Sequence, residues 1–236
     1  MLDASAAEIL SDVTTATLTT ILFKKGYRNT WIRGSAPLLP NQPRVVGPAF
    51  TMRFIPARED IASPASWSSP TSTRAAVELM PEGCVVVADT AGISDAGIFG
   101  DILCARMHRR LVRGLVTDGA VRDRSGIVTT GLPVWGRGVA APPAVAQMAF
   151  VGWQEPIGCG GVAILPGDII VADDDGAIVI PAALLSDVVA VAAEQERSEA
   201  WILQEVQQGA PLTGLYPMSA ANQARYEASR GEHDKR

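Results

Sequence analysis

The sequence predicts a layered α/β sandwich, a fold in which helices cover a mixed β-sheet. Two observations carry this prediction. Helical patterns lie near both ends of the chain, at about residues 5–25 and 182–208, and short apolar runs of strand length lie between them. These runs do not alternate regularly with helices, so separate layers are favoured over a β–α repeat. With 236 residues and 47% hydrophobic composition, the chain can bury a full core as one domain.

The first half of the chain supplies two of the helices and two of the strands. Residues 5–25 carry apolar side chains at helical spacing, which predicts one amphipathic helix. Residues 45–53 (VVGPAFTMR) have strand character, and residues 72–80 predict a short helix that ends at the Pro-Glu-Gly sequence 81–83. The run 84–89 (CVVVAD) is almost wholly apolar, which is typical of a strand buried on both faces.

The second half begins with a glycine loop at residues 97–101. The apolar residues Phe99, Leu103, Met107 and Leu111 recur every four positions and predict a helix that Gly114 ends. A buried strand is expected at residues 115–117. Later apolar runs are punctuated by turn sequences and predict a β-meander, followed by the long helix 182–208 and a polar tail that frays at its end. The meander runs are 133–135, 160–172 and 177–180, and the tail is 219–236.

Composition argues against several classes of protein. Charged residues make up 19% of the chain, the net charge is −5 and the pI is about 5.1, so we expect no nucleic-acid partner and no docking on a membrane. No apolar run approaches membrane-spanning length, and the first ten residues do not resemble a signal peptide. Cys84, Cys104 and Cys159 are scattered and odd in number, as in the reduced interior of a cytoplasmic protein.

The loop Gly97-Ile98-Phe99-Gly100-Asp101 is a candidate anion site. Glycines let a turn expose successive N–H groups, and the start of the following helix adds its positive dipole end. A substrate carboxylate would be held there. An isolated GxxG is, however, more often a plain turn before a helix, so the loop alone is weak evidence.

The adjacent pair Arg122-Asp123 follows a buried strand, at the rim where ligands of α/β proteins usually collect. The planar guanidinium suits a carboxylate and an enolate oxygen, while the carboxylate suits a hard cation such as Mg²⁺. The alternative is a surface ion pair. Asp101 and Asp118 could converge with Asp123 if the helix between them runs back along the strand.

Other candidate sites are weaker. The sequence 173–176 (DDDG) lacks the later ligands of a calcium loop and is interpreted as a turn. His108 and His233 are the only histidines. Their scarcity argues against a serine or cysteine nucleophile that is activated by a histidine base. Acid–base steps would therefore fall to carboxylates, arginine or metal-bound water. Trp67 and the serine-rich segment Ser63–Ser72 could line a pocket, but a surface loop is the favoured interpretation.

The two motifs together resemble the RraA-like family, which contains class II pyruvate aldolases acting on 4-hydroxy-4-methyl-2-oxoglutarate and 4-carboxy-4-hydroxy-2-oxoadipate. The resemblance covers roughly residues 5–200 and is more specific than any single motif. It implies an α-β-β-α sandwich related to the swivelling phosphohistidine domain. The matching segments are GxxGD at 97–101, TDGAVRD at 117–123, VVGPA at 45–49, PEG at 81–83 and LPGDIIVADDDGAIVIP at 165–181.

The resemblance also implies roles for particular residues. Asp123 would bind a divalent cation, Mg²⁺ or Mn²⁺, directly. Arg122 would contact pyruvate and steady its enolate, and Asp101 would help to hold metal-bound water. The backbone amides near Ile102 and Leu103 would take the substrate carboxylate, next to Gly97 and Gly100.

Assembly is a further implication of the resemblance. The family forms trimers or dimers of trimers, and a glutamate of a neighbouring subunit supports the water shell of the metal. Glu196 or Glu199 could match that glutamate. We expect the aldolase domain to comprise residues 1–200, followed by a C-terminal helical extension and polar tail at residues 201–236.

We therefore expect a metal-dependent carbon–carbon lyase that releases pyruvate from a 4-hydroxy-2-oxo acid and that could also decarboxylate oxaloacetate. The only lysines are Lys24, Lys25 and Lys235, remote from the proposed site, which argues against a Schiff-base aldolase. Two alternatives stay open: a non-catalytic regulator that binds ribonuclease E, and a lyase or dehydratase for a sugar-acid-derived 2-keto acid. The resemblance implies that the regulators lack the metal-binding aspartate, whereas Asp123 is present here.

Overall fold

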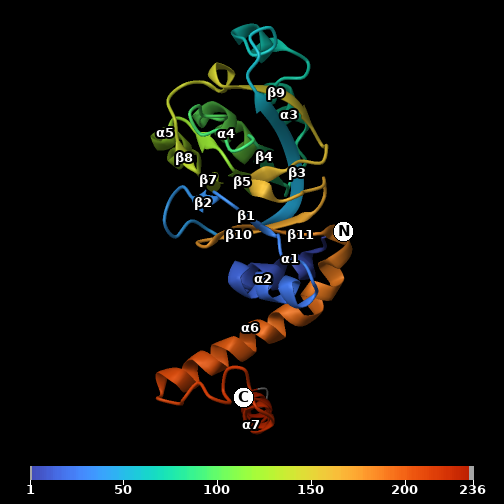
Figure 1. The fold of residues 1–236 in the computed structure, drawn as a ribbon, viewed down its shortest axis with the longest axis vertical. Coiled ribbons are helices and arrows are strands. Elements are labelled where there is room, and N and C mark those ends of the chain that lie inside the picture. Colours follow the sequence, from blue (N-terminus) through green and yellow to red (C-terminus); the bar gives the residue numbers. More distant parts are fainter. Residues whose placement is uncertain (1, 234–236) are drawn as a thin grey trace.

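A computed structural model describes residues 2–233 and shows a mixed α/β protein with a projecting C-terminal arm (Figure 1). The helices are α1 (Ala4–Asp12), α2 (Thr15–Lys24), α3 (Thr73–Leu79), α4 (Asp101–Arg109), α5 (Arg124–Thr130), α6 (Leu185–Gln207) and α7 (Ala220–His233). The strands are β1 (Trp31–Ile32), β2 (Ala36–Pro37), β3 (Val45–Pro56), β4 (Val85–Asp89), β5 (Gly114–Thr117), β6 (Ala120–Val121), β7 (Val134–Gly136), β8 (Gly138–Val139), β9 (Met148–Trp153), β10 (Ile169–Asp173) and β11 (Gly176–Ile180).

The long strand β3 connects the two halves of the main sheet, whose strand order is β1-β11-β10-β3-β4-β5-β7-β2. Its first residues, Val45 to Pro48, pair antiparallel with β10, and its later residues, Ala49 to Arg53, pair parallel with β4. The strands β4, β5 and β7 continue the parallel part, while β10 and β11 form an antiparallel hairpin. One strand therefore joins a parallel layer to an antiparallel one.

Successive buried side chains along the strands join different hydrophobic clusters, and these clusters define three layers of core. On β4, Val86 belongs to the cluster under α3 and α4, whereas Val85 and Val87 face a middle cluster with Trp135. On β11, Val179 joins the middle cluster, and its neighbours face the cluster under α1, α2 and α6. Because successive strand side chains point to opposite faces, these clusters fill the three spaces of a four-layer sandwich. The predicted α-β-β-α architecture is confirmed.

Two predicted elements were wrong in detail. Residues 5–25 form two helices, because Val13 is extended and the hydroxyl of Thr14 accepts the amide of Thr17 as the N-cap of α2. The expected β-meander is also replaced: β7 joins the parallel layer beside β5, and the meander reduces to the β10–β11 hairpin. Strand β9, which pairs with the end of β3, was not predicted.

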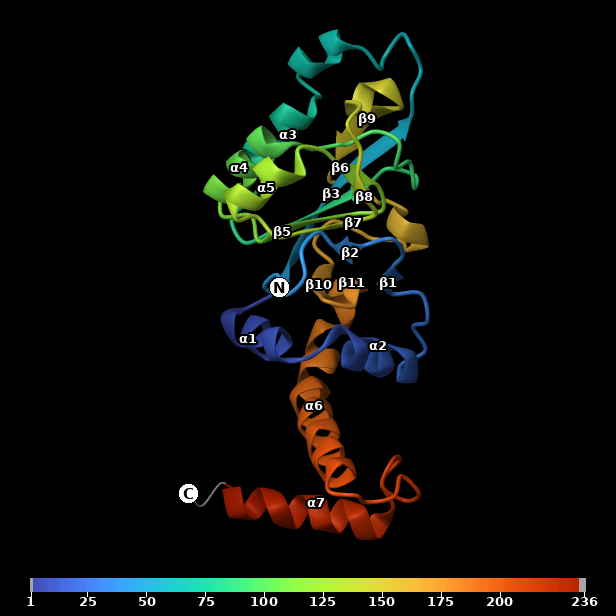
Figure 2. The ribbon, with the colours of Figure 1, turned by 90° about the vertical axis from the view of Figure 1, so that its left-hand side faces the viewer.

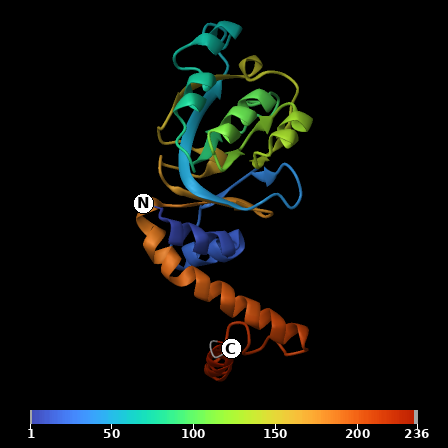
Figure 3. The same ribbon diagram turned by 180° about the vertical axis from the view of Figure 1, so that it is seen from behind.

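The C-terminal arm projects from the sandwich. Figures 2 and 3 show α6 running away from the sheet and α7 crossing its far end. Tyr226 of α7 donates a hydrogen bond of 3.0 Å to Glu194 of α6, and its ring lies 5.6 Å from that of Trp201. The predicted domain boundary at 200/201 falls inside α6, and residues 234–236 of the predicted fraying tail lie outside the described residues. None of the helices in residues 2–233 combines the length and apolarity needed to span a bilayer.

Candidate active site

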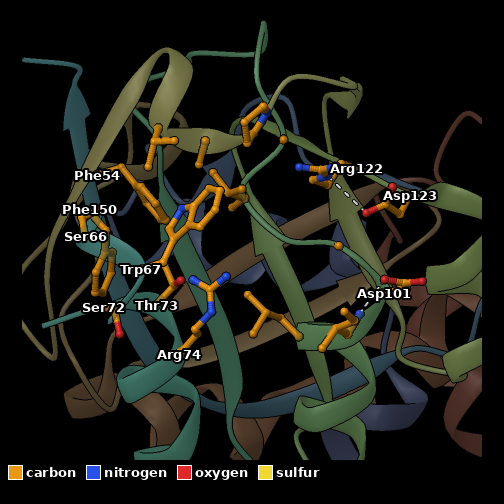
Figure 4. Close-up of a pocket in the computed structure, with 18 of the residues that line it drawn as sticks. Phe54, Ser66, Trp67, Ser72, Thr73, Arg74, Asp101, Arg122, Asp123 and Phe150 are labelled. Atoms are coloured by element: carbon orange, nitrogen blue, oxygen red, sulfur yellow. Dashed lines mark hydrogen bonds and ion pairs between the residues drawn. The ribbon is translucent and has the colours of Figure 1, made fainter. Parts of the chain in front are cut away.

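A pocket of about 270 Å³ lies beside the start of α4 and the residues that follow β6 (Figure 4). Its wall brings together three segments that are far apart in the sequence: the loop 97–103, the pair Arg122-Asp123 and the stretch 66–74. Every residue predicted for the single-chain part of the site lines this pocket. These residues are Gly97, Gly100, Asp101, Ile102, Leu103, Arg122 and Asp123.

Glycine allows the loop and the strand to come this close. A β-carbon on Gly97 would lie 2.7 Å from the β-carbon of Arg122, closer than two carbon atoms can approach. Hydrogen bonds then hold the two segments side by side: Ile98 N–H donates to Ala120 O at 3.0 Å, and Arg122 N–H donates to Phe99 O at 2.9 Å. The GxxG motif is therefore a contact surface for Arg122 as well as the start of a helix.

Asp123 adopts a left-handed backbone conformation, with φ 56° and ψ 44°. Aspartate tolerates this region better than most residues, but the conformation still costs free energy, and such outliers cluster at functional sites. Its Oδ2 lies 3.1 Å from Nε of Arg122. Both side chains keep substantial exposure, 46% for Asp123 and 37% for Arg122, so the pair remains accessible to a ligand.

Asp101 opens α4 and lies on the same side of the pocket as Asp123 (Figure 4). Its Oδ1 accepts the amide of Ile102 at 2.7 Å. The N-cap of α4 is Gly100, which has no side chain to bond the amides of the first turn. Apart from the N–H of Ile102, which Asp101 accepts, the first-turn N–H groups have no capping side chain, and a helix start of this kind favours an anion through such groups and its dipole.

The two carboxylates are a suitable donor set for a hard divalent cation. Among the described residues, no cluster of three or more His, Cys, Asp or Glu side chains could hold a metal. A cation at Asp101 and Asp123 would thus have only two carboxylate side chains. Mg²⁺ is commonly bound in this way, through one or two carboxylates with water and substrate completing its shell. The residues present fit such an ion.

Asp118 does not join this group. It is 3% exposed and accepts hydrogen bonds from Thr90 N and Oγ1, both at 2.8 Å, and from the amides of Gly92 and Gly160. The considered convergence of Asp118 with Asp101 and Asp123 is therefore wrong. Its carboxylate links the loop after β4 to the loop before β10 by hydrogen bonds.

Glu196 and Glu199 lie on α6 and face α2 of the same chain. Glu196 accepts the amide of Thr14 at 3.3 Å, and Glu199 accepts the hydroxyl of Thr17 at 3.0 Å. Within one chain they belong to the opposite side of the sandwich from the pocket. Their predicted role concerned a neighbouring subunit, and it stays a prediction.

Sequence reasoning missed part of the pocket wall. Phe54 of β3 and Phe150 of β9 lie 5.1 Å apart and close the pocket behind Trp67. Nothing in the sequence indicates that these strands pair. Arg74 was also missed, although the Ser/Thr-rich stretch around Trp67 was an available signal. The structure answers the question left open for that stretch, since Ser66, Trp67, Thr71 and Ser72 all line the pocket.

The cysteines take no part in this site. All three are buried, and burial raises the pKa of Cys84 and of Cys104 to about 12. Burial, with the nearby charges of Asp118 and Asp89, also raises the pKa of Cys159 well above its ordinary value. The thiols therefore stay protonated near neutral pH and are poor nucleophiles.

These features define an α/β protein whose pocket gathers two arginines and two aspartates at the start of a helix. The sequence model of the family RraA-like (Aldolase/RraA) matches residues 10–179. The chain belongs to the RraA-like family.

Named relatives match about 60% of the chain. Over 146 residues it is 32% identical to protein DlpA of Legionella pneumophila, covering 62% of this chain and 23% of DlpA. Over the same length it is 36% identical to the "Putative 4-hydroxy-4-methyl-2-oxoglutarate aldolase" of Halalkalibacterium halodurans, covering 61% of this chain and 63% of that protein. The matches thus span less than two thirds of either relative.

A solved structure resembles the whole sandwich. RraAS2 of Streptomyces coelicolor, described as an unusual member of the RNase ES inhibitor RraA protein family, superposes with a TM-score of 0.75 at 32% identity. The match covers 85% of this chain and 96% of RraAS2. The likeness therefore extends over nearly all of that protein.

Proposed function

We propose that the protein is a divalent-metal-dependent aldolase that cleaves a 4-hydroxy-2-oxo acid to pyruvate and a second carbonyl compound. The observation that carries this proposal is the meeting of Arg122, Asp123 and Asp101 with the uncapped start of α4 in one pocket. Relatives named as aldolases of this type support it. A small 2-oxo acid is the proposed ligand, and the pocket of about 270 Å³ suits a molecule of that size.

In this proposal Asp123 would hold Mg²⁺ or Mn²⁺ directly, and Asp101 would support it through water; the ion when bound supplies Lewis-acid polarisation of the 2-oxo group. The substrate carboxylate would lie at the first turn of α4, near the amides of Ile102 and Leu103. These contacts would orient the C3–C4 bond for cleavage. Holding a substrate in its reactive orientation lowers the barrier of a reaction.

Cleavage converts the C4 hydroxyl to a carbonyl and breaks the C3–C4 bond. The hydroxyl proton leaves, the bonding electrons form the enolate of pyruvate, and protonation at C3 gives pyruvate. Arg122 would stabilise the enolate oxygen, because it lines the pocket and its side chain remains 37% exposed despite its bond to Asp123. Asp101 would hold the water that carries the proton away, since the bond to Ile102 engages one of its two oxygens.

The test is pyruvate release from 4-hydroxy-4-methyl-2-oxoglutarate and from oxaloacetate, with Mg²⁺ and then with EDTA. We expect release that EDTA abolishes and added Mg²⁺ restores. Asp123→Asn should remove the metal-dependent rate, and Arg122→Met should lower kcat/KM by roughly 10²- to 10³-fold, as the loss of one oxyanion donor does in other enzymes. Wild-type rates in Asp123→Asn would contradict the proposed mechanism.

A second candidate function is regulation of a ribonuclease by binding. It is favoured by the likeness to RraAS2, which covers 96% of that protein. The two proposals differ in what the pocket does. Inhibition of ribonuclease E that survives Asp123→Asn, without pyruvate release by the wild type, would favour the regulator.

The assembly belongs to the same proposal. We propose a homotrimer or dimer of trimers in which Glu196 or Glu199 reaches the pocket of a neighbouring subunit. Light scattering gives the mass of the particle. Mixing Asp123→Asn subunits with Glu196→Gln or Glu199→Gln subunits should restore activity in part, because some mixed interfaces then contain both native residues.

A further inference from the structure

The wall of the pocket that faces Arg122 carries a second arginine. Figure 4 shows Arg74 and Trp67 on one side of the pocket, with Arg122, Asp123 and Asp101 on the other. The guanidinium carbon of Arg74 lies 5.3 Å from the centroid of the Trp67 ring. This stacking orients the guanidinium without using its N–H donors.

Arg74 has no carboxylate partner within residues 2–233, in contrast to the other pocket arginine. Arg122 is paired with Asp123 at 3.1 Å. The two stacked arginines of the C-terminal arm are also paired: Arg225 with Glu205, and Arg230 with Glu194. The donors of Arg74 are thus available to a ligand at the wall of a cavity.

The charges of the pocket balance for a ligand with two negative groups. Its charged lining consists of Arg74, Arg122, Asp101 and Asp123. A divalent cation bound beside Asp101 and Asp123 would cancel the charge of these two aspartates, Asp123 included, which would leave the two guanidinium groups uncompensated. A substrate with a single carboxylate would satisfy only one of these positive charges, whereas a dicarboxylate would satisfy both.

Apolar side chains also line the pocket, among them Phe54, Leu103 and Val145, and Figure 4 shows Thr73 next to Arg74. A short carbon chain with a polar group at each end suits a pocket that has arginines on opposite sides and apolar side chains in its lining. A monocarboxylic substrate has nothing to bind at Arg74.

We propose that Arg74, held over Trp67, is a specificity-determining residue that binds the distal carboxylate of a dicarboxylic 4-hydroxy-2-oxo acid. This inference rests on the proposed function for the reaction, and what it adds is the residue that recognises the distal carboxylate. The planar fork of arginine suits bidentate contact with a carboxylate, so lysine would replace it only in part.

Ligand binding tests the inference without turnover. Isothermal titration with Mg²⁺ present compares 2-oxoglutarate with 2-oxopentanoate, which has the same chain length but ends in a methyl group. We expect the wild type to prefer 2-oxoglutarate by roughly 10- to 100-fold, the range that a charge-assisted hydrogen bond contributes. Arg74→Met should abolish the preference and Arg74→Lys should retain part of it. Arg109→Met is the matched control, because Arg109 is exposed in the last turn of α4, away from the pocket.

Turnover provides the second measurement. The pair 4-hydroxy-4-methyl-2-oxoglutarate and 4-hydroxy-4-methyl-2-oxopentanoate differs in the same distal carboxylate. Arg74→Met should lower kcat/KM for the diacid by roughly 10- to 100-fold, mainly through KM, and leave the monoacid unchanged. Equal losses for both substrates, or a wild type without a diacid preference in binding, would overturn the role of Arg74. Retained binding preference without any pyruvate release would instead overturn the proposed reaction and leave the distal site standing.

Discussion

A β-carbon on Gly100 would lie 2.5 Å from Oδ2 of Asp123, so these two residues meet at a distance that glycine alone permits. Gly100 is also the N-cap of α4. One position thus sets both the location of the Asp123 carboxylate and the exposure of the first amides of α4. The glycine motif and the Arg-Asp motif are parts of a single contact.

The first prediction follows from this contact. Gly100→Ala should displace the Asp123 carboxylate and lower kcat/KM for metal-dependent pyruvate release by about 10²-fold, the cost of an ångström-scale misplacement in other active sites. Gly158→Ala is the matched control, since its β-carbon would meet nothing closer than 3.9 Å and its φ is −116°. An unchanged rate in Gly100→Ala would show that the position of Asp123 does not matter for the reaction.

The second prediction separates Asp118 from catalysis. Its carboxylate accepts four hydrogen bonds in a buried site, so Asp118→Asn should lower the free energy of unfolding by about 2–4 kcal/mol, because an amide NH₂ group then faces backbone donors. Urea denaturation measures this change. Asp95→Asn, at an exposed position of the neighbouring loop, should change stability by less than about 0.5 kcal/mol. Equal stability of the two variants would contradict the structural role.

The third prediction concerns the cysteines. Because burial raises the pKa of Cys84 and Cys104 to about 12, and that of Cys159 well above its ordinary value, these thiols are protonated in the folded protein at pH 8. Ellman's reagent should react only slowly with the native protein. In urea, which exposes the thiols, it should react with all three. Rapid labelling of any native cysteine would show that its segment opens readily.

The fourth prediction is acid-dependent loosening of the C-terminal arm. Burial tends to raise the pKa of Glu194, but hydrogen bonds from Arg197 and Tyr226 and the charge of Arg230 outweigh it and lower the pKa below its ordinary value. The ionised carboxylate therefore stabilises the contact of α7 with α6 above the pKa of the unfolded chain. This contribution is lost as the pH falls through the lowered pKa of the folded state.

Hydrogen exchange of the α7 amides, corrected for intrinsic rates, measures this contribution. Glu194→Gln should exchange faster than the wild type at pH 6, and the difference should shrink toward pH 3. Glu227→Gln is the control, because Glu227 bonds Gln223 within α7. A difference that persists at pH 3 would mean that packing of the helices, such as Trp201 on Tyr226, outweighs the ion pairs.

Local patterns predicted the elements well where one physical cause dominates. The apolar run 84–89 became the buried strand β4, and Ser72, which accepts the amide of Ala75, begins α3 where expected. The prediction of a single helix at residues 5–25 was wrong because the hydrophobic spacing is continuous across Val13 and Thr14. The break between α1 and α2 depends instead on the hydrogen bond of the Thr14 cap. Hydrophobic periodicity reports which face is buried and does not register a single interrupted turn.

The sequence by itself determined the layered fold, the family and the residues of the glycine loop and of the Arg-Asp pair, because these depend on local pattern and on residue chemistry. Only the tertiary structure decided that Asp118 ties loops together, that β9 pairs with β3, and that Arg74 and Trp67 face Arg122 across a pocket. Those relationships join segments some 30 to 100 positions apart. Their physical basis is packing between layers, which no short window of sequence contains.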